Sequence, residues 1–216
     1  MKPWIKVCGV RTSEQAEMIA ACGATAIGIN FWPGSPRHVS VHEGVRIAAA
    51  VRGVLSIVAV TVNAEPALLA RIREQVHPDY FQCHGDESDE QVRAMGARAY
   101  KAVGLALQDD VKRALAVPGP FVLVDAKDFV QRGGTGKAPP DDLVAQVCTA
   151  RPTLLAGGLV PDNVAAAVAR FTPMGVDTAS GVESSPGIKD PDMTRDFVRF
   201  AQNALRDAYR MLSTAG

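Results

Sequence analysis

Two residues of the chain could form an acid–base pair, and each stands at the end of an apolar, strand-like run. Cys8 follows residues 4–7 and precedes Gly9, and Asp125 follows residues 121–124. A thiolate can act as a base or nucleophile, and desolvation can raise the pKa of a carboxyl so that it acts as an acid. Each residue also has an ordinary interpretation, because free cysteines are often buried and inert, and such an aspartate can cap a helix or anchor a loop. Placed at one site, the two would supply an acid and a base in different environments.

Three glycine-bearing segments in the last part of the chain could bind a phosphate group. Glycine lets backbone N–H groups approach phosphate oxygens closely, and the hydroxyls of Thr135 and Ser180 would add donors. Ordinary tight turns also use glycine, but three successive segments in this order favour a binding site over turns alone. The expected phosphate-binding residues are Gly134, Thr135, Gly136, Gly157, Gly158, Ser180 and Gly181.

The elements that must position these residues alternate regularly along the chain. Short apolar runs predict strands, and the longer amphipathic stretches between them predict crossover helices. The expected strands are 4–8, 26–31, 55–62, 80–84, 99–105, 121–125, 153–156 and 175–179, and the helices begin near 13, 41, 65, 88, 109, 140, 162 and 191.

Eight such units predict an α/β fold, a single (β/α)₈ TIM barrel of eight parallel strands, as one domain over residues 1–216. The last helix is expected to end at Met211, with residues 213–216 as a frayed tail. An open doubly wound sheet is less favoured, because Cys8-Gly9-Val10-Arg11 lacks the glycine-rich dinucleotide-binding fingerprint after the first strand. In a barrel, the active site would lie at the carboxyl ends of the strands.

Composition narrows the class of partner. The chain has 23 Lys and Arg and 23 Asp and Glu, so no excess positive charge is available for nucleic acid or an anionic membrane. We therefore expect a small substrate.

The four scattered cysteines and the N-terminus without a signal-peptide pattern indicate a cytoplasmic protein. Neither His38 with His42 nor Cys83 with His84 offers enough ligands, so no metal site is predicted. Arg37 is either a solvated loop charge or a bidentate donor for a substrate carboxylate.

Taken together, these motifs resemble the phosphoribosylanthranilate isomerase family of tryptophan biosynthesis, in the family's order and over residues 4 to 205. The matching segments are Lys6-Val7-Cys8-Gly9, Ser35-Pro36-Arg37, Val62-Asn63, Gln82-Cys83-His84-Gly85, Asp125, Gly133-Gly134-Thr135-Gly136, Ala156-Gly157-Gly158-Leu159, Val176-Asp177 and Ser180-Gly181-Val182-Glu183. The chain departs from the family at Cys83, where leucine is usual, and at 138–141, which replaces an aromatic-containing segment.

The resemblance implies a cofactor-free Amadori rearrangement of N-(5′-phosphoribosyl)anthranilate. It implies that Asp125 is the general acid that protonates the ring oxygen and that Cys8 is the general base that removes the C2′ proton. Arg37 would face the anthranilate carboxylate, and Asp177, His84 and Asn63 would complete the substrate-binding residues. Family members are commonly monomeric, so a monomer is expected.

Two other functions remain open from the sequence. The related histidine-pathway sugar isomerase performs the same rearrangement on a larger substrate with two phosphates, but it uses aspartates in both catalytic positions, where this chain has Cys8. A bifunctional enzyme of both pathways is a variant of that alternative. A non-catalytic phosphate-binding barrel would leave Cys8 and Asp125 without a role.

Overall fold

Eight parallel strands close into a barrel in the computed structural model, which describes residues 3–125 and 141–214. The strands are hydrogen-bonded in sequence order, and β1 pairs with both β2 and β8 to close the barrel. Their bounds are β1 Trp4–Cys8, β2 Ala26–Asn30, β3 Ser56–Thr61, β4 Tyr80–Cys83, β5 Ala99–Gly104, β6 Val122–Asp125, β7 Thr153–Ala156 and β8 Gly175–Thr178. The predicted barrel is confirmed.

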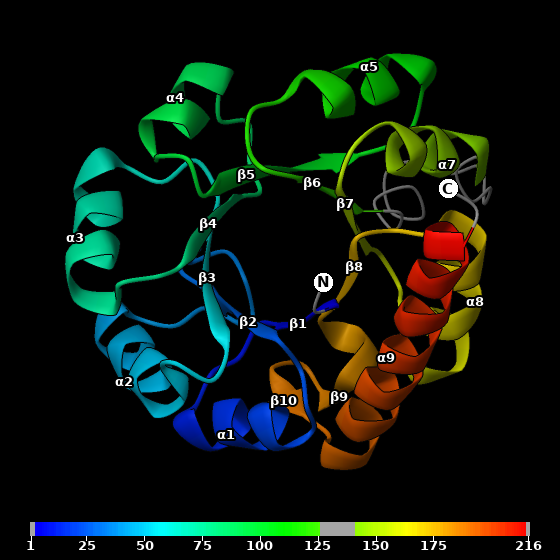
Figure 1. Cartoon of the computed structure of the whole chain (residues 1–216). Coiled ribbons are helices and arrows are strands. Elements are labelled where there is room, and N and C mark those ends of the chain that lie inside the picture. The colour runs from blue at the N-terminus through cyan, green and yellow to red at the C-terminus, as the bar shows by residue number, and fades with distance from the viewer. Residues whose placement is uncertain (1–2, 126–140, 215–216) are drawn as a thin grey trace.

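Helices surround the barrel, as Figure 1 shows. Their bounds are α1 Ser13–Ala21, α2 Val41–Val51, α3 Pro66–Val76, α4 Asp89–Ala94, α5 Gln108–Ala116, α7 Asp141–Ala150, α8 Pro161–Phe171 and α9 Pro191–Thr214. Local sequence explains several starts. Ser40 and Ser88 each form a capping box at the beginning of α2 and α4, which satisfies backbone donors that have no partner within the helix.

The strands bury side chains on both faces, which accounts for their nearly continuous apolar sequences. Val58 and Val60 of β3 point to the interior of the barrel, whereas Ile57 and Ala59 pack with the helices outside. On β1, Trp4 and Cys8 belong to the interior cluster. Since side chains alternate along a strand, Lys6 also faces the interior.

An additional small element follows β8 and was not predicted. A short 3₁₀ turn, η1 (Ser180–Val182), leads into the antiparallel strands β9 (Glu183–Ser185) and β10 (Ile188–Lys189). Gly187 permits the turn between them with a φ of 83°. The hairpin contacts the beginning of α1, where Gln15 Nε2 donates to the Gly187 carbonyl at 3.0 Å.

The predicted boundaries agree with the structure to within two residues, except at the C-terminus. The expected end of the last helix at Met211 is wrong, because α9 continues to Thr214. Residues 213 and 214, expected to be frayed, are therefore helical, and residues 215–216 lie outside the described part. Figure 1 shows α9 beside α8 on the outside of the barrel. Among the described residues, no helix has the length and apolar character needed to cross a bilayer.

Candidate active site

The parallel strands bring the predicted catalytic residues to one rim of the barrel. Cys8 ends β1 and Asp125 ends β6, and β7 and β8 lie between these two strands. Both residues are partly exposed. Asp177 of β8 is buried, and His84 directly follows β4. This rim is where the active sites of such barrels are built.

Cys8 shares its surroundings with a buried ion pair. Lys6 Nζ donates to Asp177 Oδ1 at 2.9 Å, and the Lys6 side chain is fully buried. A Cβ atom on Gly28 would lie 2.6 Å from Cys8 Sγ and 3.0 Å from Lys6 Nζ. Thiol and ammonium therefore border the same small space, which exists because β2 has a glycine there.

Burial and charge act in opposite directions on Cys8. Burial raises the pKa of the Cys8 thiol, the Lys6 ammonium lowers it and the Asp177 carboxylate raises it, and on balance the pKa lies above its usual value. Burial lowers the pKa of Lys6, but Asp177 and its other neighbours outweigh burial and raise it. Lys6 is therefore positively charged at neutral pH.

Arg37 is held by a carboxylate of the hairpin. Its Nε and Nη2 donate to the two oxygens of Glu183 at 2.8 and 2.7 Å. The buried Lys189 donates to the same carboxylate at 2.7 Å and to the Ala179 carbonyl at 2.9 Å. Of the five N–H groups of the guanidinium, three remain for other partners. The Arg37 side chain is 20% exposed, so it is more constrained than a solvated loop charge.

His84 is exposed at the rim and is linked to the barrel interior. The buried Tyr100 hydroxyl donates to Gln82 Oε1 at 2.9 Å, and Gln82 Nε2 lies 2.9 Å from His84 Nδ1. With the amide oriented in this way, Nδ1 accepts and the neutral ring carries its proton on Nε2. The arrangement presents an N–H donor from His84 on the other side of the ring.

Asn63 has a visible structural role next to His84. It adopts a left-handed conformation with φ of 47°, and its Oδ1 accepts a hydrogen bond from the Asp86 N–H at 2.7 Å. Its own N–H donates to Glu87 Oε1 at 2.8 Å. Asn63 thus ties the loop after β3 to the loop after β4.

The last two predicted phosphate segments contact each other. Gly157 and Gly158 both have left-handed φ angles, of 95° and 67°. The Leu159 carbonyl accepts a hydrogen bond from Thr178 Oγ1 at 2.8 Å, and a Cβ on Gly181 would lie 1.9 Å from the same oxygen. Glycine is therefore required at position 181 for the two loops to meet. The third segment, with Gly134, Thr135 and Gly136, lies outside the described residues.

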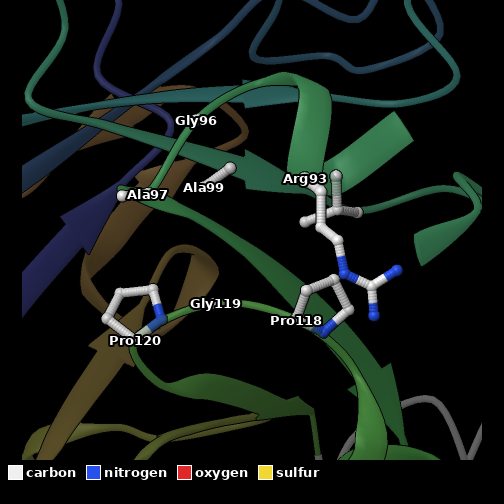
Figure 2. Close-up of a pocket in the computed structure, with 8 residues that line it drawn as sticks. Arg93, Gly96, Ala97, Ala99, Pro118, Gly119 and Pro120 are labelled. Carbon is white, nitrogen blue, oxygen red and sulfur yellow. The ribbon is translucent and has the colours of Figure 1, made fainter. Parts of the chain in front are cut away.

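A pocket of about 270 Å³ lies elsewhere, at the connections that lead into β5 and β6 (Figure 2). Arg93, Gly96, Pro118 and Gly119 are among its lining residues, and it contains none of the predicted site residues. These connections precede the strands, so the pocket is at the end of the barrel opposite the rim. No group of three or more His, Cys, Asp or Glu side chains suited to a metal occurs within residues 3–125 and 141–214.

The family comparison agrees with the fold. A family model described as N-(5′-phosphoribosyl)anthranilate (PRA) isomerase matches residues 5–200. The chain belongs to this family. The N-(5′-phosphoribosyl)anthranilate isomerase of Rhodopseudomonas palustris strain CGA009 is 39% identical over 94% of the chain and 100% of its own length. The N-(5′-phosphoribosyl)anthranilate isomerase of Magnetococcus marinus is also 39% identical, over 93% of the chain and 95% of its own length.

Solved structures of the family superpose on the barrel. Phosphoribosyl anthranilate isomerase from Thermotoga maritima has a TM-score of 0.84 and 34% identity, with 93% of this chain and 99% of that chain covered. A second structure of the family contains reduced 1-(o-carboxyphenylamino)-1-deoxyribulose 5-phosphate. It has a TM-score of 0.79 and 32% identity, with 93% and 99% of the two chains covered.

Three charged residues near the site were not predicted from the sequence, namely Lys6, Glu183 and Lys189. Lys6 could have been noticed, because a lysine two residues before Cys8 in an apolar strand must face the same side as Cys8. Glu183 lay in a matched segment, but nothing pointed to its pairing with Arg37. Lys189 belongs to the unpredicted hairpin, and its sequence neighbourhood carries no signal.

Loss of the Lys101 ammonium is expected to destabilise this family member strongly. Lys101 Nζ donates to Glu87 Oε2 at 2.7 Å and to the carbonyls of Gly85 and Glu87 at 2.8 and 2.9 Å, and both side chains are buried. Lys101→Met leaves a buried, unpaired carboxylate, so the free energy of unfolding should fall by about 3–5 kcal/mol. Urea denaturation would measure the change.

The matched variant Lys101→Met/Glu87→Gln removes both charges and should recover part of that loss. Burial raises the pKa of Glu87, but Lys101 and backbone donors outweigh burial and lower it below 4.5. The wild type should therefore lose the stability that this pair contributes as the pH falls below about 4.5, and the double variant should not. Equal stability of Lys101→Met and wild type would contradict the prediction.

Proposed function

We propose that this family member catalyses the Amadori rearrangement of N-(5′-phosphoribosyl)anthranilate to 1-(2-carboxyphenylamino)-1-deoxyribulose 5-phosphate, in tryptophan biosynthesis. The observation that carries the proposal is that Cys8 and Asp125 end strands at the same rim of a barrel of this family. Ring opening needs a proton donor, and abstraction of a proton from carbon needs a base on another side of the sugar. We assign these roles to Asp125 at the end of β6 and Cys8 at the end of β1.

In this mechanism, Asp125 donates a proton to the furanose ring oxygen as the C1′–O bond breaks. The electron pair of the anthranilate nitrogen forms the C1′=N bond of a protonated Schiff base. The Cys8 thiolate then removes the C2′ proton, giving an enolamine that tautomerises to the ketone. No cofactor is needed for these proton transfers.

We assign the substrate contacts to other residues of the same rim. Arg37 retains three N–H groups beyond those used by Glu183, which suits a planar carboxylate on the anthranilate ring. His84 offers its Nε2–H, and Asp177 offers a carboxylate oxygen beyond the one bound to Lys6. For Asn63, whose oxygen already binds Asp86 N–H, the amide NH₂ is the group we assign to the substrate.

The phosphate would be bound between the loops that follow β7 and β8. The left-handed glycines Gly157 and Gly158 and the close approach of Gly181 to Leu159 support this placement, together with the beginning of α8 at Pro161. Ser180 would add a hydroxyl donor. Gly134, Thr135 and Gly136 are proposed to complete the site from the loop after β6.

The proposed partner of this protein is the small phosphorylated substrate, and we propose that the protein binds neither nucleic acid nor membrane. We further propose that it is a cytoplasmic monomer with a single domain. The balance of 23 basic and 23 acidic residues supports a site that binds anions by local donors alone. A related structure contains a phosphorylated ligand of this chemical class, which agrees with the proposal.

The test is turnover by the purified wild type, followed through the loss of substrate fluorescence. The larger, doubly phosphorylated substrate of the histidine-pathway isomerase serves as the comparison. We expect turnover of the anthranilate derivative and little or none of the comparison substrate. Turnover of neither would overturn the enzyme assignment in favour of a binding protein, and turnover of both would establish a bifunctional enzyme.

A further inference from the structure

Lys6 is a buried charge that has no role in the proposed reaction. Lys6 is fully buried below the rim, where it is paired with Asp177, and its ammonium and the Cys8 thiol border the same space next to Gly28. A buried ammonium is costly to desolvate, and an ion pair at such a place does not by itself favour stability. Its position beside the proposed base suggests an electrostatic role.

We propose that Lys6 is a positioning residue that stabilises the thiolate of Cys8, and that Asp177 limits the strength of this effect. The inference rests on the proposed function, in which Cys8 is the general base. It concerns how a cysteine in a largely apolar barrel can lose its proton at all.

The need for such a residue follows from burial. A thiol with an ordinary pKa of 9.0 is about 1% ionised at pH 7, and burial lowers that fraction further. Lys6 lies on the same strand and the same face as Cys8, so the barrel itself fixes its position. Cys8 Sγ and Lys6 Nζ lie 2.6 and 3.0 Å from the same point beside Gly28, so the two atoms are at most 5.6 Å apart. At an effective dielectric constant of about 20, an ammonium within that distance of a thiolate favours ionisation by more than one pH unit.

The other charged and titratable groups near Cys8 do not replace Lys6. Arg37 and Lys189 share the single Glu183 carboxylate, which offsets one of their two charges, and the Lys189 ammonium lowers the pKa of Cys8 less than the Lys6 ammonium does. Tyr100 is buried, and burial raises the pKa of its hydroxyl, so it is neutral. Asp177 acts against the thiolate but also holds Lys6 in place. Lys6 is therefore the cation whose removal should raise the pKa of the Cys8 thiol most.

The experiment measures the pH dependence of Cys8 alkylation by iodoacetamide without substrate, with each cysteine followed separately by mass spectrometry. Iodoacetamide is a small reagent, which suits a cysteine that is only partly exposed. Lys6→Met is expected to raise the midpoint of alkylation by about one pH unit or more, with an alkylation rate near neutral pH about tenfold lower. Cys22, at the end of α1, is the internal control and should not change.

Asp177→Asn and Lys6→Met/Asp177→Asn complete the test. Asp177→Asn removes the opposing carboxylate, so its midpoint should fall below that of the wild type. The double variant leaves no unpaired charge, which favours folding if Lys6→Met alone is unstable, and its midpoint should lie above that of Asp177→Asn. A purely structural role for Lys6 predicts no such ordered shift.

Two results would overturn the proposal: coincident profiles for Lys6→Met and wild type, or coincident profiles for Asp177→Asn and the double variant. Because alkylation is measured without substrate, it is independent of the isomerase assay. An inactive wild type with the expected shifts would refute the proposed function alone. An active wild type with unchanged profiles would refute the role of Lys6 alone.

Discussion

Asp125→Asn is expected to lower kcat for N-(5′-phosphoribosyl)anthranilate by about 10²–10⁴, the usual contribution of a general acid. Asparagine keeps the shape of the side chain but has no acidic proton to give to the ring oxygen. Because Asp125 acts on the transition state of ring opening, KM should change much less than kcat. Steady-state fluorescence kinetics would measure both constants.

Asp109→Asn is the matched control for that experiment. Asp109 is exposed in the first turn of α5, where it pairs with Lys112 in solvent. The same chemical change there should leave kcat near the wild-type value, because exposed pairs contribute little. A kcat for Asp125→Asn within about tenfold of wild type would refute the assignment of Asp125 as the acid.

The barrel could be predicted from the sequence because its signal is local and repeated. Each strand is a short apolar run with buried faces on both sides, and each is followed by an amphipathic helix that covers the outside. Cys8 and Asp125 could be placed for the same reason, since each ends such a run. Once the strands are parallel and closed, their carboxyl ends must share one rim.

The charged partners around the site could not be predicted in the same way. Lys6 and Asp177 are 171 residues apart, and Arg37 and Glu183 are 146 residues apart. These pairs depend on closure of the barrel between β1 and β8 and on a hairpin with short strands, which carries weak sequence signals. The sequence left Arg37 as either a solvated loop charge or a donor for a substrate carboxylate, whereas in the folded chain two of its nitrogens donate to Glu183.

Asn63 illustrates a second limit of prediction from motifs. Its place in a segment shared with the family indicated a substrate contact, but its backbone conformation and its hydrogen bonds to Asp86 and Glu87 give it a local structural task. A residue type with a carbonyl and an amide can serve both purposes, and only the fold shows which atoms are already used. Together with Lys101, this loop connection supports His84 at the rim.

Cys8→Ala is expected to lower kcat by about 10²–10⁴, because it removes the proposed base for the C2′ proton. Fluorescence kinetics again provide the measurement. Cys22→Ala is the control, since Cys22 lies at the end of α1, away from the rim, and should leave kcat unchanged. Cys8 also packs against the interior cluster, so a loss of turnover in the alanine variant could arise from packing as well as from chemistry.

Cys8→Ser separates these two causes. Serine nearly preserves the shape of cysteine, so interior packing and the free energy of unfolding should stay close to wild type. Its hydroxyl gives up a proton far less readily than a thiol, and Lys6 cannot make up that difference, because one ammonium at this distance shifts ionisation by only a few pH units. Serine should therefore lose about as much kcat as alanine. Near wild-type turnover in Cys8→Ser would show that position 8 is needed for its shape, and the base would have to be sought elsewhere at the rim.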